Sequence, residues 1–298
     1  METRRLQLLL ELSRLGSMRA VAGALGTTTS TVSQQIAVLA RETGAALIEP
    51  TGRRVRLTPA GRRLAEHAVM ILAAVEAARL DLDPDAEPAG TVRIAGFATA
   101  VGRSLLPVVT HLAERHPQVR LLIREHEPAD ALALLATDTV DLALTYDYNL
   151  APAADDRTLT WTPLWTAQWG LGVPGPFKQA AADAAAATLE QFRDQPWVVN
   201  SRNTADEQVI RTLAGLAGFS PQIAHQADSL DLVEDLITAR LGIGLLPLDR
   251  LTGPDVRVLP LTEPAVTMRA YANTRLGRRT WPPLALVLSL LNDPQIHR

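Results

Sequence analysis

The chain has 298 residues, of which 47% are hydrophobic and 20% charged, so it can form two or three domains with ordinary apolar cores. It has no cysteine, which excludes disulfide bonds, thiolate metal sites and thiol redox chemistry. The formal net charge is −3, but residues 1–63 contain ten Arg and only four Glu, so the rest of the chain is acidic. A basic head on an acidic body indicates that a polyanion binds near the N-terminus.

The first part of the chain predicts three helices. Residues 4–15 form a helix with leucines on one face, and it packs beneath two shorter helices. Ser17 is a suitable N-cap for the first of these, Gly26 permits a sharp turn, and Thr28 is a suitable N-cap for the second. Two short helices joined in this way are typical of a helix-turn-helix, whose second helix lies in the DNA major groove.

The outer face of this helix pair carries short hydroxyl and amide side chains, which can contact base edges or phosphates. On this stretch alone, an ordinary amphipathic helix pair with a polar face is the slightly better interpretation, but the segments that follow favour DNA binding. The candidate DNA contacts in the pair are Ser17, Arg19, Thr28, Thr29, Ser30, Thr31, Ser33, Gln34 and Gln35.

A short hairpin with a basic turn follows the helices. Residues 47–49 and 55–57 are predicted strands, and residues 50–53 form the turn between them. Arg53, Arg54 and Arg56 place three guanidinium groups on this wing. A cluster of like charges is usually only a solvated surface, but beside a helix-turn-helix we expect it to contact phosphates or the minor groove.

A long helix then begins at Thr58 and Pro59, a good N-cap and a good first helical residue. A weak heptad seam along it consists of Leu64, Ala68, Ile71, Val75, Ala78 and Leu82. The seam could pack against the chain's own body, but we favour dimerisation with a second copy, which would set two recognition helices on two half-sites. The polar residues 83–90, which include two prolines, predict a hinge and a domain boundary.

Beyond the hinge, predicted strands alternate with predicted helices, which favours a parallel α/β sheet. The predicted strands cover residues 91–96, 119–124, 141–146, 197–200, 222–227, 244–247 and 266–273. The predicted helices cover residues 105–115, 130–136, 206–217, 230–239 and 281–291. The alanine-rich residues 180–187 predict no element.

One known family matches the N-terminal pattern of residues. The matching residues are Gly16, Ser17, Ala20, Ala22, Leu25, Val32, Ser33, Gln35, Ile36, Leu39, Gly44, Leu47, Thr51, Gly52, Arg53, Leu57, Thr58, Ala60 and Gly61. With this spacing, residues 1–90 resemble the N-terminal domain of LysR-type transcriptional regulators. The resemblance implies a winged helix-turn-helix DNA-binding domain over residues 1–58, and a dimerisation linker helix with a hinge over residues 59–90.

The rest of the chain resembles the effector domain of the same family more loosely. The similar runs are Leu106 and Pro107, His116 and Pro117, Val119, residues 141–144 and residues 242–247. The resemblance implies an effector-binding domain over residues 91–298 with two Rossmann-like α/β subdomains that face each other as in a periplasmic binding protein. Subdomain I would cover residues 91–165 and 266–298, and subdomain II residues 166–265, with crossings near 164–168 and 261–266. The expected fold class is α/β overall, with a helix-rich head.

Open α/β sheets bind ligands at the carboxyl ends of their strands, near helix N-termini. The residues at these ends that we expect to contact an effector are Ala98, Thr99, Ala100, His126, Asp147, Tyr148, Asn200, Ser201, Asn203 and Asp228. Thr99 and Ser201 also resemble effector-contacting positions of the family. Their small hydroxyls beside helix N-termini would suit a carboxylate ligand.

Some of these residues have a simpler interpretation. Asp147 and Asp228 have a simpler role available, as helix caps or salt-bridge partners. If Asp147 does lie in an effector site, it could bind an amino group or repel an acid. Ser229 is interpreted as a plain N-cap. Trp161, Trp165 and Trp169 are interpreted as core or subunit-interface residues in strands rather than as a cage around a ligand.

We therefore expect a sequence-specific DNA-binding transcriptional regulator controlled by a small-molecule effector between the two subdomains. The alternative is a cytoplasmic solute-binding or sensor protein without ligand-dependent regulation; a solute receptor for transport would need export and no basic head. The sequence lacks a Gly-x-Ser-x-Gly elbow, a phosphate loop and a His-x-x-x-His pair, so we expect no enzyme, no catalytic residue, no metal site and no cofactor.

The expected partners are double-stranded DNA, an unidentified small-molecule effector and a second copy of the chain, and the family resemblance extends this homodimer to a homotetramer. The sequence contains neither an apolar run of membrane length nor an N-terminal signal core. We therefore expect a cytoplasmic protein with no membrane partner.

Overall fold

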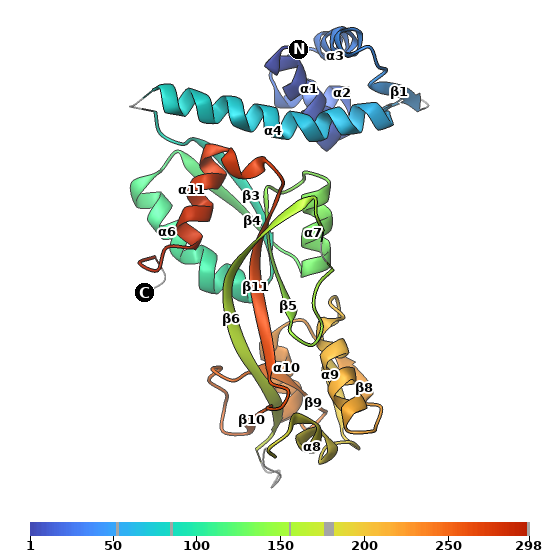
Figure 1. Cartoon of the computed structure of the whole chain (residues 1–298), viewed down its shortest axis with the longest axis vertical. Coiled ribbons are helices and arrows are strands. Elements are labelled where there is room, and N and C mark those ends of the chain that lie inside the picture. Colours follow the sequence, from blue (N-terminus) through green and yellow to red (C-terminus); the bar gives the residue numbers. More distant parts are fainter. Residues whose placement is uncertain (52–53, 84–85, 155, 176–181, 297–298) are drawn as a thin grey trace.

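The computed structural model describes residues 1–51, 54–83, 86–154, 156–175 and 182–296, which form a helical head, a long helix and an α/β body (Figure 1). The head contains helices α1 (Thr3–Leu15), α2 (Met18–Ala24) and α3 (Thr29–Thr43), and the hairpin of β1 (Ile48–Thr51) and β2 (Arg54–Leu57). Helix α4 (Pro59–Leu82) continues from the head across one end of the body (Figure 1).

Local capping explains where the head helices begin and end. Ser17 Oγ accepts a hydrogen bond from Ala20 N at 3.5 Å, and Thr28 Oγ1 accepts one from Thr31 N at 3.1 Å. Gly44 ends α3 in the left-handed conformation, with a φ of 67°, which glycine adopts without steric cost. Buried apolar side chains of all three helices form one core with the wing and the start of α4. The predicted winged helix-turn-helix is confirmed.

Gly61 allows α4 to cross the base of the wing at close range. A Cβ atom at this position would lie 2.0 Å from the carbonyl oxygen of Leu47, so no larger residue fits without movement of the backbone. Thr58 forms hydrogen bonds with both Gly61 and Leu47. Its Oγ1 accepts one from Gly61 N, and its backbone N donates one to the Leu47 carbonyl, each at 3.0 Å. The head and the first turns of α4 therefore form one packed unit.

The body contains one mixed sheet with the strand order β4-β3-β5-β11-β6-β9-β7-β8, and β10 pairs with β6. The strands are β3 (Gly90–Gly96), β4 (Val119–Glu125), β5 (Leu142–Tyr148), β6 (Leu159–Pro174), β7 (Pro196–Val199), β8 (Gln222–Gln226), β9 (Ile243–Pro247), β10 (Val256–Pro260) and β11 (Val266–Arg275). The short strands β3, β4 and β5 are parallel in one half, and β7, β8 and β9 are parallel in the other. The long strands β6 and β11 pair antiparallel and connect the two halves (Figure 1).

Helices flank each half of the sheet. The first half carries α5 (Ala98–Ala100), a π-helical turn (Val101–Leu105), α6 (Leu106–Arg115), α7 (Pro128–Ala136), a 3-10 turn (Arg278–Thr280) and α11 (Pro282–Leu291). The second half carries α8 (Ala185–Glu190), α9 (Ala205–Leu216) and α10 (Leu230–Thr238). The predicted α/β fold is confirmed, although α8 and β10 fall where the sequence pattern predicts no element. Within the described part of the chain, no helix is both long and apolar enough to cross a membrane.

Ion pairs anchor the head on the body of the same chain. Arg14, at the end of α1, donates from Nε to Asp138 Oδ2 at 2.6 Å. Asp141, just before β5, accepts hydrogen bonds of 2.8–2.9 Å from the guanidinium groups of Arg93 and Arg278. Both aspartates are almost fully buried, with exposures of 3% and 1%. Burial lowers the pKa of Arg14, but the nearby carboxylates of Asp138, Glu11 and Asp141 together outweigh burial and raise it, so the guanidinium group stays charged.

Candidate functional site

The outer face of α3 is the first candidate site. Thr29, Ser30, Ser33 and Gln34 are exposed on it, and Arg19 of α2 is exposed beside it. The other predicted contacts have partners within the head. Ser17 and Thr28 serve as N-caps, Thr31 and Thr28 share a hydrogen bond between their hydroxyls at 2.8 Å, and Gln35 Oε1 accepts from Arg5 Nε at 2.9 Å. The exposed set is therefore the part that can contact another molecule without breaking these bonds.

The wing is the second candidate site. Arg56 is exposed on β2, and its Nε donates to Glu49 Oε1 across the hairpin at 2.6 Å. Arg53 lies outside the described residues, and for Arg54 only the backbone is described. Since Glu49 neutralises part of the charge of Arg56, a phosphate must compete with this exposed ion pair.

The heptad seam of α4 divides into two parts. Ala68 is fully buried in the head core, and Leu64 and Ile71 pack against that core, so the first part is used within the chain. Val75 is half-buried, whereas Leu82 at the end of the helix is 84% exposed. A second copy would therefore meet the outer edge and the far end of α4 rather than the whole predicted seam.

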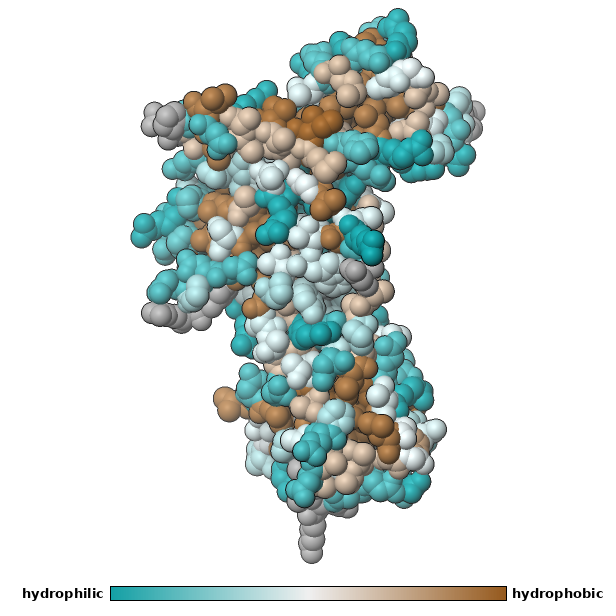
Figure 2. Space-filling model, in the orientation of Figure 1, coloured by the Kyte–Doolittle hydropathy of each residue, from teal (hydrophilic) through white to brown (hydrophobic). Residues whose placement is uncertain are grey.

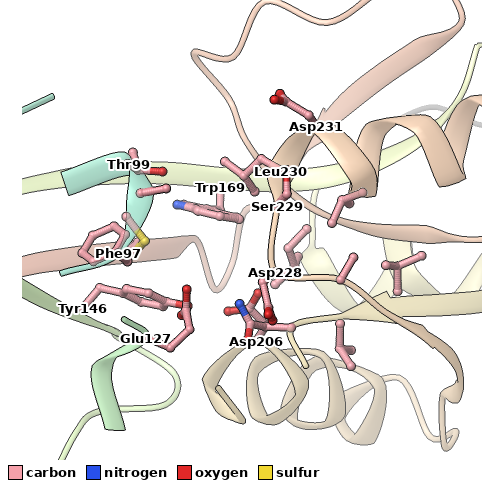
Figure 3. Close-up of a pocket in the computed structure, with 18 of the residues that line it drawn as sticks. Phe97, Thr99, Glu127, Tyr146, Trp169, Asp206, Asp228, Ser229, Leu230 and Asp231 are labelled. Atoms are coloured by element: carbon pink, nitrogen blue, oxygen red, sulfur yellow. The ribbon is translucent and has the colours of Figure 1, made fainter. Parts of the chain in front are cut away.

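A cavity of about 480 Å³ lies between the two halves of the body and is the third candidate site (Figure 3). In the first half its lining comes from the ends of β3, β4 and β5, with Trp169 of β6 and Met268 of β11. In the second half it comes from the end of β7, the first turns of α9 and α10, and β9. Side chains from both halves point toward one another across it (Figure 3).

The structure brings four of the predicted effector contacts into the lining, namely Ala98, Thr99, Asn200 and Asp228. Two others support the lining from behind. Ser201 donates from N and Oγ to Asp228 Oδ1 at 2.9 and 2.6 Å, and Asn203 N donates to Asn200 Oδ1 at 2.8 Å.

The remaining predicted contacts do not line the cavity, and Asp147 shows why. Alternation along β5 turns Asp147 away from Tyr146, onto the other face of the sheet. There its two oxygens accept from Arg269 at 2.8 and 2.7 Å, so it is a structural ion pair. Tyr148 is fully buried behind Trp169, with ring centroids 5.5 Å apart. Ala100 is buried in the core, and His126 is half-buried outside the lining.

Acidic side chains dominate the electrostatics of the cavity. Tyr146 Oη donates to Glu127 Oε2 at 3.0 Å, and burial raises the pKa of Glu127 although this bond opposes the rise. Burial also raises the pKa of Asp206, to about 7. Burial would raise the pKa of Asp228 too, but donors from Ser201 and Arg202 outweigh it and lower that pKa.

Several lining residues are not found by searching the carboxyl ends of the predicted strands. Asp206 lies in the first turn of α9, and Trp169 lies inside the long β6, so neither follows a predicted strand. The interpretation of Trp169 as core is incomplete, because it is 5% exposed and also lines the cavity. Ser229 occupies the N-cap position of α10 but makes no side-chain capping bond, and it lines the cavity. The sequence predicts Ser229 as an N-cap, but only the structure shows that its hydroxyl makes no capping bond.

Comparison with known families accounts for both the head and the body. The family described as "Bacterial regulatory helix-turn-helix protein, lysR family" matches residues 3–62. The family described as "LysR substrate binding domain" matches residues 85–293, which is more than half of the chain. The chain belongs to the LysR family. It is a DNA-binding transcriptional regulator of the LysR type with an effector-binding domain, and not an enzyme.

Individual LysR-type proteins align over most of the chain. The transcriptional dual regulator GltC of Bacillus subtilis is 28% identical over 221 residues, 73% of this chain and 71% of GltC. The structure of a full-length OxyR variant from Pseudomonas aeruginosa covers 99% of this chain and 96% of its own, with a TM-score of 0.72 and 16% identity. Full-length CbnR, solved with its target DNA, covers 100% of both chains with a TM-score of 0.53 and 20% identity. These two structures establish the shared fold.

Proposed function

We propose that a small molecule in the cavity controls how a homodimer of this regulator binds specific DNA sequences. The observation that carries the proposal is a cavity lined by both halves of the body, beside the strands β6 and β11 that connect them. A ligand that contacts both halves favours the arrangement in which those contacts are best, and so shifts the population of arrangements. A sensor without regulation would have no use for the basic head that the chain carries.

Sequence recognition is assigned to the exposed face of α3, and phosphate contact to Arg19 and the wing. Ser30 and Gln34 are exposed four residues apart, so they share one face of α3 and suit contact with base edges, and the head carries an excess of Arg. The proposed units are a DNA-binding domain over residues 1–58, a linker over 59–90 and an effector-binding domain over 91–298. Because the protein acts on DNA, we place it in the cytoplasm of a bacterial cell.

Dimerisation is assigned to the exposed side of α4. Figure 2 shows apolar residues gathered along this helix, and Leu82 at its end is 84% exposed. A partly exposed apolar stripe that ends in an exposed leucine suits an interface, and a second copy of the same helix matches it in length and chemistry. The family resemblance extends the assembly to a tetramer.

The test of the proposed function uses DNA that the protein itself selects from a random-sequence pool. We expect tight binding to the selected sequence and weaker binding to a scrambled one, measured by fluorescence anisotropy over a series of salt concentrations. Sedimentation velocity of the intact chain and of Leu82→Glu should show a dimer that the variant weakens. Equal affinity for both DNAs would contradict sequence-specific recognition, and a monomeric intact chain would contradict dimerisation.

A further inference from the structure

The charge of the cavity is strongly unbalanced. Among its described lining residues are five carboxyl side chains, those of Glu125, Glu127, Asp206, Asp228 and Asp231, and one guanidinium group, that of Arg250. Arg250 does not neutralise the other carboxyl groups, because its guanidinium group already pairs with Asp231 at 2.5 Å and with Glu234 at 3.0 Å. An anionic ligand would have to approach these carboxylates without a free positive charge among the described lining residues.

Three of the five carboxyl groups, those of Glu125, Glu127 and Asp206, have no ion-pair partner in the described part of the chain, and of these three only Glu125 is exposed. Asp228 has one, because Arg202 Nε donates to its Oδ2 at 2.6 Å. Glu127 accepts a hydrogen bond from the Tyr146 hydroxyl. Oδ1 of Asp206 is buried with no hydrogen-bond partner among the described residues, and the nearby Tyr148 hydroxyl is the donor that acts on this carboxyl group. Glu127 from the first half and Asp206 from the second point toward the same space (Figure 3). Burying such groups is costly unless something pairs with them.

An unpartnered donor lies in the same cavity. Trp169 is 5% exposed, and its Nε1 has no hydrogen-bond partner among the described residues. In Figure 3 this nitrogen points toward the side of the cavity where Thr99 lies, away from Asp206. The cavity therefore presents unpaired acceptors at one place and an unpaired donor at another, and a ligand that satisfies both needs a cationic donor and an acceptor.

The other walls suit the body of such a molecule. Phe97, Tyr146 and Trp169 present aromatic rings, whose faces attract cations. The apolar wall consists of Val198, Val199, Leu230, Val233, Leu245 and Met268. No three carboxylate or imidazole side chains among the described residues have an arrangement that could hold a metal ion, so an organic cation fits the site better than a metal.

We propose that the effector is an amine cation that pairs with Glu127 and Asp206, lays a hydrocarbon body along the apolar wall, and accepts a hydrogen bond from Trp169 Nε1. This inference rests on the proposed function, since it names the ligand class of the same cavity. It replaces the carboxylate ligand that the hydroxyls of Thr99 and Ser201 suggest from the sequence.

The proposal implies that binding depends on pH. Asp206 faces Glu127 and the Tyr148 hydroxyl, with Asp228 and its partner Arg202 on the neighbouring loops, and its pKa is about 7. A bound cation favours the ionised carboxylate and lowers that pKa, so binding releases a proton. Affinity should therefore rise as the pH increases from about 6 to about 8.

The experiment compares four compounds with the same five-carbon chain: aminopentanol, pentylamine, pentanediol and glutarate. Each is added to the intact protein at constant ionic strength, and the melting temperature is measured. We expect the largest rise with aminopentanol, about 3 °C or more at ten times its Kd, and a smaller rise with pentylamine, which lacks the acceptor. Pentanediol and glutarate should leave the melting temperature unchanged.

Matched variants separate the site from general charge effects. Asp206→Asn and Glu127→Gln should abolish the rise with both amines, and Trp169→Phe should make aminopentanol no better than pentylamine. Asp235→Asn and Glu114→Gln, which change exposed carboxyl groups outside the cavity, should leave the rise intact.

The cation class is overturned if neither amine raises the melting temperature, or if glutarate or pentanediol raises it as much. It is also overturned if Asp206→Asn keeps the full response. Any of these results would leave the DNA-binding function standing, because the binding of selected DNA and its salt dependence are measured without a ligand. Loss of selective DNA binding would instead remove the proposed function itself.

Discussion

Asp206 is a side chain whose protonation couples the stability of the body to pH. Its pKa is about 7 in the folded chain, mainly because of burial, against about 3.9 for an unperturbed Asp. Between these two values the folded state holds a proton that the unfolded state has released. The free energy of unfolding therefore falls as the pH rises from about 4 to about 7, by about 1.4 kcal/mol for each unit of pKa shift at most.

Asp206→Asn should remove this decline. We expect the variant to gain melting temperature relative to the intact chain at about pH 8 and to gain none at about pH 4. Asp235→Asn, on the exposed side of α10, should behave as the intact chain at both values. A gain of the same size at both pH values would show that the carboxyl group is not desolvated in the folded state.

Gly61 sets the contact between α4 and the wing. Gly61→Ala places a methyl group against the Leu47 carbonyl, and we expect a loss of roughly 1 to 3 kcal/mol of unfolding free energy, as in other overpacked sites. Gly23→Ala is the matched control, because no atom lies within 4 Å of its Cβ position and alanine favours helices. Chemical denaturation measures both, and equal stability of the two variants would contradict the close approach.

At the scale of elements, local signals made most of the fold predictable. The N-caps Ser17, Thr28 and Thr58 each make the expected bond to the first turn of a helix, and these bonds need no tertiary information. Short parallel strands are also visible as apolar runs between helices. The alanine-rich α8 and the short β10 carry no such signal, because their formation depends on neighbours far away in the sequence.

The cavity was less predictable than the elements that surround it. Strand ends correctly indicate Thr99, Asn200 and Asp228, since the carboxyl ends of parallel strands meet at one edge. The same rule selects Asp147, which alternation turns to the opposite face, and it omits Asp206 and Trp169. The last two reach the cavity only because β6 and β11 bring the two halves of the body together.

Variants of Gln34 on α3 and of Arg19 on α2 should distinguish base recognition from phosphate binding. Gln34 is exposed on its outer face, and we expect Gln34→Ala to lose roughly 1 to 3 kcal/mol of preference for the selected DNA over scrambled DNA. Arg19→Ala should weaken binding to both DNAs equally and reduce the dependence of affinity on salt. Anisotropy titrations measure both effects, with a melting control for each variant. An equal loss on both DNAs in Gln34→Ala would make this residue a phosphate contact.

At the scale of the whole molecule, the head is fastened to its own body through Arg14. Removing this side chain leaves the buried Asp138, within the described residues, with Arg275 at 3.7 Å as its remaining ion-pair partner. We expect Arg14→Ala to cost roughly 1 to 3 kcal/mol of stability and to speed hydrogen exchange along α1, because a buried carboxylate loses its main partner. Arg79→Ala, which breaks the exposed pair with Glu76, should cost almost nothing. Equal effects of the two variants would mean that the head is not held by this pair.

The network at Asp141 and the cavity lie at opposite ends of the same strand, β5, with Tyr146 at the cavity end. We propose that a ligand that changes the arrangement of the two halves acts on the head through this strand. By linkage, the ligand and DNA then change each other's affinity by the same factor.

The most direct measurement is a nuclease footprint of the intact protein on its selected DNA, with and without saturating aminopentanol. We expect the amine to change the protected length or the pattern of enhanced cleavage between the half-sites, and we expect Asp206→Asn to show one footprint under both conditions. An identical footprint for the intact protein, with the amine bound, would contradict control of DNA binding by the cavity.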